Sequence, residues 1–138
     1  MNSVYLASVS QKINKMTTAE LNNLLANNVL DIRFVRRLPK RGMPATRRML
    51  CTKSNELLSS NNGVISLNYR APVQTPDYDP TAEGLVTVWD IFMQDFRNVP
   101  AESVTVLNTI PGNDKFWEYF NNELRLMTPQ QKFKFMMS

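Results

Sequence analysis

The stretch RFVRRLPKRGMPATRRMLC, residues 33–51, carries the side chains of this chain that are best suited to binding an anion. It contains six arginines, one lysine and no acid. Arginines on a projecting ribbon can neutralise phosphates, release counterions and enter a groove of a nucleic acid. The candidate contact residues in this stretch are Arg33, Arg36, Arg37, Lys40, Arg41, Arg47 and Arg48.

The basic charge is concentrated in one part of the chain. The 138 residues carry 16 Arg and Lys against 12 Asp and Glu, a net charge of +4. Residues 31–53 hold eight of the basic residues and a single acid, Asp31. This density exceeds what the protection of a sheet edge against aggregation requires. The patch therefore suggests a nucleic acid, an acidic protein, or the chain's own acidic loop around residues 77–83 as its occupant.

Two further residues outside the basic stretch complete the candidate contact set. Arg70 ends a predicted strand over residues 64–70. Trp89 and Phe92 fall on opposite faces of a regular strand, so one of them is expected to be exposed or covered by a flanking helix. Trp89 is the better candidate for the core and Phe92 the better candidate for a contact. An exposed aromatic ring is a stacking platform for single-stranded bases.

The same sequence excludes most catalytic chemistry. It holds no histidine and one cysteine, Cys51, so Ser–His and Cys–His pairs are impossible. A zinc site with nitrogen and sulfur ligands is nearly excluded for the same reason. No phosphate-binding glycine loop and no paired carboxylates stand out. We expect no enzymatic activity, no catalytic residues, no metal and no cofactor, and we interpret Cys51 as a small core residue.

Helices are predicted on both sides of a β-rich region. Residues 3–15 have a weak helical pattern, and Thr17 stands three residues before Glu20, a capping box that begins a firmer helix. After Gly112, Asn113 is a predicted cap for a helix with a regular apolar face. A final helix is predicted from Thr128, which precedes proline and stands three residues before glutamine.

Between the helices the apolar period is that of short strands. We expect strands before and after the basic turn, at 64–70, two within 85–100, and one at 105–110, with a long acidic proline loop at 71–84. A turn centred near residues 41–42 pairs Phe34 with Met49 and Ile32 with Cys51 as an inward column. The outward column then holds Arg33, Arg37 and Arg48, with Lys40 and Arg41 at the tip.

Short antiparallel strands close economically into a small barrel, because closure removes the sheet edges. We therefore predict one α+β domain over 1–138. Its parts are N-terminal helices (1–28), a barrel of five to six short strands (29–110) and C-terminal helices (113–138). The alternative is an open roll that the terminal helices half cover.

Part of the sequence resembles small SH3-like β-barrel proteins encoded by large tailed phages. The motifs are a basic turn, MLCT, GLVTVWDI and DFRNVPAESV, within residues 32–110. The long loop at 71–84 and both helical flanks depart from the pattern. The resemblance implies an SH3-like barrel and a viral source but little chemistry, because that family is largely without assigned function. The matching residues are Met49, Cys51, Thr52, Val86, Val88, Trp89, Asp90, Phe96, Arg97 and Val104.

These observations predict a non-enzymatic phage accessory protein that binds DNA or RNA through the basic hairpin, with weak sequence preference. One alternative is an effector that docks on an acidic surface of a host machine such as RNA polymerase or a nuclease. A second alternative is a structural virion component.

The remaining expectations concern location and assembly. No stretch approaches the roughly 20 apolar residues of a membrane span, and no secretory signal is readable. We expect the protein in the cytoplasm, the host's if it is viral, without a membrane partner. The aromatic and methionine-rich C-terminal helices are expected either to cover the open end of the barrel or to pair two subunits as a homo-oligomer.

Overall fold

The structure is a computed structural model that describes residues 15–38, 41–58 and 80–138. Several predictions lie outside these residues. They are the helix over 3–14, the strand over 64–70 and residues 71–79 of the loop predicted at 71–84.

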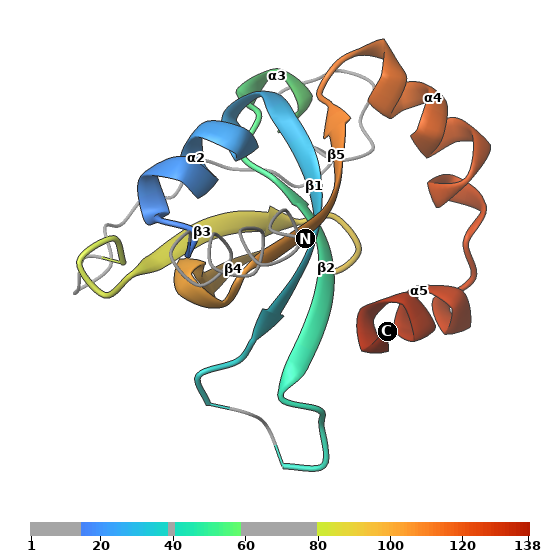
Figure 1. Ribbon diagram of the computed structural model, residues 1–138. Helices are drawn as coiled ribbons and strands as arrows, with labels where there is room; N and C mark the ends of the chain where they lie inside the picture. Colours follow the sequence, from blue (N-terminus) through green and yellow to red (C-terminus); the bar gives the residue numbers. More distant parts are fainter. Residues whose placement is uncertain (1–14, 39–40, 59–79) are drawn as a thin grey trace, which may run out of the picture.

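Five strands in the described part of the chain form one antiparallel sheet in the order β4-β3-β2-β1-β5 (Figure 1). Four of them confirm the predicted strands on either side of the basic turn and within 85–100, and the fifth confirms the one at 105–110. The bounds are β1 (Asn28–Val35), β2 (Thr46–Thr52), β3 (Leu85–Asp90), β4 (Asp95–Pro100) and β5 (Thr105–Pro111).

The sheet is not closed, so the prediction of a closed barrel was wrong. Its two edge strands, β4 and β5, run in the same direction, because every neighbouring pair in the sheet is antiparallel. Only the short 3-10 turn η1 (Ala101–Ser103) and Val104 join these strands. Parallel pairing needs a crossover of about a dozen residues or more, so β4 and β5 cannot pair to close the barrel.

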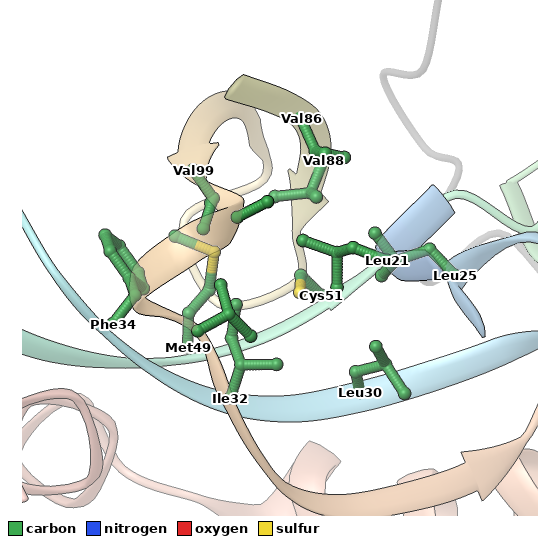
Figure 2. Close-up of a cluster of buried hydrophobic side chains, with 12 residues drawn as sticks. Leu21, Leu25, Leu30, Ile32, Phe34, Met49, Cys51, Val86, Val88 and Val99 are labelled. Atoms are coloured by element: carbon green, nitrogen blue, oxygen red, sulfur yellow. The ribbon is translucent and has the colours of Figure 1, made fainter. Parts of the chain in front are cut away.

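The helix α2 (Thr18–Asn27) covers the inner face of the sheet and begins at the predicted capping box. The Thr17 hydroxyl oxygen accepts from the Glu20 amide at 3.1 Å, and the Glu20 carboxylate accepts from the Thr17 amide at 3.3 Å. Leu21 and Leu25 of this helix are fully buried against the sheet (Figure 2). The inner cluster consists of Leu21, Leu25, Leu30, Ile32, Phe34, Met49, Cys51, Val86, Val88, Val99, Ala101 and Val104.

The β1–β2 hairpin has a different register from the predicted one. Ile32 lies opposite Met49, whereas the sequence predicted Ile32 opposite Cys51, so that pairing was wrong. The turn is centred one residue earlier, which shifts the pairing by two residues. Because side chains alternate with a period of two, this shift leaves every side chain on its predicted face. The inward position of Ile32, Phe34, Met49 and Cys51 is confirmed, and Arg33 lies opposite Arg48 on the outer face.

The outer face lies under the helices that follow β5. The helix α4 (Asp114–Asn122) begins at Asn113, whose side-chain oxygen accepts from the Lys115 amide as predicted. The 3-10 turn η2 (Leu124–Leu126) leads to α5 (Pro129–Met137), which begins at the predicted Thr128 capping box and packs on β2. The short helix α3 (Asn55–Leu58) and α4 contribute buried residues to a second hydrophobic cluster, the outer cluster. The outer cluster consists of Val29, Leu50, Leu57, Leu58, Trp89, Ile91, Phe116, Phe120 and Leu124.

A close backbone approach at Gly112 ties β5 and α4 to the end of α2. The Gly112 amide donates to the Asn27 carbonyl at 2.9 Å, and a Cβ at this position would lie 2.8 Å from that oxygen. We expect Gly112→Ala to lower the free energy of unfolding by about 1–3 kcal/mol, because backbone must move to admit the methyl group. Urea denaturation measures the change, with Thr109→Ala, an exposed site on β5, as control. A Gly112→Ala protein as stable as the wild type would contradict this packing.

Candidate anion-binding site on the β1–β2 hairpin

The basic residues sit on a ribbon that extends beyond the rest of the sheet, away from α3 and α4 (Figure 1). Pairing continues past the ends of the strands, where the Arg36 amide donates to the Ala45 carbonyl at 2.8 Å. Gly42 has a φ of +80°, a conformation that glycine adopts without steric cost in a turn. Lys40 at the tip, like Arg70, lies outside the described residues.

Arg48 is held in a buried ion pair. Its Nε donates to Asp31 Oδ1 at 2.8 Å, and its Nη2 donates to Asp31 Oδ2 at 2.6 Å. The Asn108 side-chain Nδ2 donates to Asp31 Oδ2 at 2.9 Å. The Asp31 side chain is 5% exposed and that of Arg48 is 24% exposed. The hydrogen bond with Asp31 raises the pKa of Arg48. Two of the three guanidinium nitrogens, Nε and Nη2, are used in this ion pair.

Arg47 is paired as well. Its Nη2 donates to Asp90 Oδ2 at 2.5 Å, and only 11% of the Arg47 side chain is exposed. The other oxygen of Asp90 accepts from the amides of Phe92 and Met93, each at 3.1 Å. Asp90 thereby fixes the β3–β4 turn, in which Gln94 has a φ of 53°.

Three other arginines lie at the surface. Arg33 donates to the main-chain oxygen of Ser138 at 3.2 Å. Arg37 pairs with Glu102 at 3.0 Å, but both side chains are more than 40% exposed, and such pairs contribute little to stability. Arg41 is exposed near the tip of the hairpin.

Arg36 has a like charge, Arg47, as a neighbour. Burial lowers its pKa, and so does the positive charge of Arg47. Its Nη1 donates to the Pro44 carbonyl at 3.4 Å, a long hydrogen bond to an uncharged acceptor. An anion bound beside Arg36 would relieve the repulsion between these two guanidinium groups.

The two aromatic predictions have different outcomes. Trp89 is 3% exposed, which confirms it as a core residue. Phe92 is half-buried in the β3–β4 turn, where the ring of Phe135 from α5 meets it edge-on with centroids 5.1 Å apart. Lys132 lies 5.9 Å from the centre of the Phe92 ring. Phe92 is thus at the surface of the sheet but under α5.

The sequence analysis missed the acids that pair with the arginines, namely Asp31, Asp90 and Glu102. Asp31 carried a usable signal, because it is the one acid in the basic segment and lies on the same face of β1 as Arg33. Asp90 and Glu102 lie far from the hairpin in sequence, and only the fold brings them to Arg47 and Arg37.

Cys51 is fully buried, and desolvation followed by the charges of Asp90 and Asp31 raises the pKa of its thiol. Within residues 15–38, 41–58 and 80–138, no group of three or more acids and cysteines is placed to hold a metal ion. In the same ranges, no helix has both the length and the apolar character of a membrane span.

The buried pair predicts a large stability effect from one arginine. Arg48→Ala leaves the Asp31 carboxylate buried without its charged partner, and we expect the free energy of unfolding to fall by about 3 kcal/mol. Arg48→Lys keeps the charge but loses the two-point contact, so its loss should be smaller. Chemical denaturation measures both, and the exposed Arg41→Ala is the control that should leave stability unchanged. Equal stability of Arg48→Ala and Arg41→Ala would show that the pair is not structural.

The arrangement as a whole consists of an open sheet, a projecting ribbon with exposed arginines, and two arginines held by buried acids. Comparisons with protein-family models, curated proteins and solved structures find no match.

Proposed function

We propose that this protein is a non-enzymatic nucleic-acid-binding accessory protein. The observation that carries the proposal is a projecting ribbon on which exposed Arg41 and partly exposed Arg36 have no acidic partner among the contacts of the described residues. Arg33 and Arg37 extend this surface. Arg33 donates to a main-chain oxygen and Arg37 pairs with an exposed carboxylate, and both contacts are weak enough for a phosphate to replace them. Guanidinium groups in such a row suit the regularly spaced phosphates of DNA or RNA.

Phosphate contacts position a protein on nucleic acid without reading its sequence. The sequence preference of this protein is therefore weak, and its affinity falls as salt rises. The resemblance to SH3-like phage proteins adds a proposed source and a location in the host cytoplasm. The antiparallel five-stranded sheet and the single turn between β4 and β5 are features that support this proposed relationship, whereas the open sheet and both helical flanks depart from it.

Binding of a short fluorescent DNA duplex, measured by anisotropy, tests the proposal. We expect binding near 50 mM salt that weakens steeply toward about 200 mM. Log affinity falls linearly with log salt concentration, and the double variant Arg36→Ala/Arg41→Ala should make this slope shallower by roughly 2, about one for each lost phosphate contact.

The control Lys115→Ala/Arg125→Ala removes the same charge from exposed sites on α4 and η2. It should bind like the wild type at moderate salt. The proposal fails if the wild type binds neither DNA nor RNA near 50 mM salt. It also fails if both double variants weaken binding equally, because net charge alone would then explain the effect.

A second function is favoured by two apolar side chains on the same ribbon. Leu38 is 89% exposed and Val35 is 48% exposed, beside the arginines. Apolar side chains among cations suit an acidic protein surface better than a phosphate backbone, because they can be buried in a protein partner. The competing proposal is therefore an effector that docks on an acidic host protein such as RNA polymerase.

The variant Leu38→Ala separates the two functions. We expect Leu38→Ala to retain DNA affinity within about twofold, because an apolar side chain contributes little to a phosphate contact. Surface plasmon resonance with purified host RNA polymerase, after nuclease treatment, measures the alternative. Tight polymerase binding by the wild type that Leu38→Ala weakens, together with absent DNA binding, would replace the first proposal with the second.

A further inference from the structure

The helix α5 lies over Arg33, Arg47, Arg48 and Phe92, all of them predicted contact residues. The Ser138 hydroxyl accepts from Arg48 Nη1 at 3.0 Å, and the Ser138 main-chain oxygen accepts from Arg33. Arg47 Nη2 lies 3.6 Å from the sulfur of Met136. The basic outer surface of β1 and β2 is thus covered by the chain's own C-terminal helix.

The helix α5 makes few buried contacts with the sheet. None of the α5 residues is buried, and Phe133 is 55% exposed. The helix is held by half-buried Phe135, which packs on the outer cluster, meets Phe92 edge-on and lies 4.1 Å from the Arg48 guanidinium. The Ser138 oxygens add hydrogen bonds to Arg33 and Arg48. Elements with few buried apolar contacts are the ones that open at low free-energy cost.

The groups that α5 offers to the sheet match those of a nucleotide. Phe135 places an aromatic ring against Phe92 and under a guanidinium, as an unstacked base would. The two Ser138 oxygens accept from Arg33 and Arg48, as phosphate oxygens would. We infer that the surface under α5, formed by Arg33, Arg48 and Phe92, is a subsite for single-stranded nucleic acid that α5 occupies until the strand displaces it. The inference rests on the proposed function.

Arg48 can serve in this subsite without leaving the fold. Its Nε and Nη2 stay with Asp31, and its Nη1 is the group that Ser138 now occupies. A duplex keeps its bases stacked, so only a single strand can place a base on Phe92. While α5 is closed, the measured affinity is reduced by the fraction of molecules in the open state.

The test compares two phenylalanines on the same helix. Phe135→Ala removes the contacts with Phe92 and Arg48, and it should bind a short single-stranded oligonucleotide about three- to tenfold more tightly than the wild type. Phe133→Ala removes an exposed ring and should not change this affinity. Thr128→Ala weakens the α5 capping box without touching the sheet, and it should also tighten binding. Phe92→Ala added to Phe135→Ala should abolish the gain.

A second measurement follows α5 in the wild-type protein. Saturating single-stranded oligonucleotide should remove hydrogen-exchange protection from the amides of 132–137, while the sheet amides stay protected. The inference is overturned if α5 stays protected at saturation, or if Phe135→Ala binds no more tightly than Phe133→Ala. If either result occurs while the duplex still binds through Arg36 and Arg41, only this inference fails. If the wild type and Phe135→Ala bind neither duplex nor single strand, the proposed function fails with it.

Discussion

The buried carboxylate of Asp31 is the constraint on which the outer face of this protein depends. A charge that is 4% exposed must be compensated by a paired cation and by hydrogen bonds. Arg48 from β2 and Asn108 from β5 supply these groups, so one carboxylate on β1 ties three neighbouring strands together. The remaining nitrogen of Arg48 and the face of its guanidinium then hold α5. The same interaction stabilises the sheet and positions its cover.

The pairing also divides the basic hairpin into two groups of arginines. Arg47 and Arg48 are bound to buried acids and act mainly in the structure. Farther toward the tip, Arg41 is exposed and Arg36 is partly exposed, so both can act in binding. The functional patch is therefore smaller than the number of arginines in the sequence indicates, and it lies farther from the core. Because the ribbon is anchored by ion pairs at its root, its outer arginines are presented on a stiff support rather than on a flexible tail.

Local signals in the sequence predicted much of this fold. Both capping boxes, the strand 46–52 and the inward face of the hairpin follow from short-range spacing and are present as predicted. The hairpin register was two residues off, which placed Asp31 opposite Thr52 and hid its diagonal contact with Arg48. Pairs such as Arg47 with Asp90 depend on how β2 meets β3, and that pairing has no local signature. The prediction of a closed barrel was wrong for a topological reason. The edge strands β4 and β5 run in the same direction, and the link between them is too short for parallel pairing.

The central claim is this division between structural and binding arginines, and side-chain NMR tests it most directly. Exchange of each arginine Nε proton with water is measured in the free protein and again with saturating DNA duplex. We predict slow exchange at Arg48 in both states, because its Nε donates to buried Asp31. Arg36 and Arg41 should exchange fast when free and should shift and slow when DNA is bound. Fast exchange at Arg48, or a DNA-induced change confined to Arg48 while Arg36 and Arg41 stay unchanged, would contradict the account.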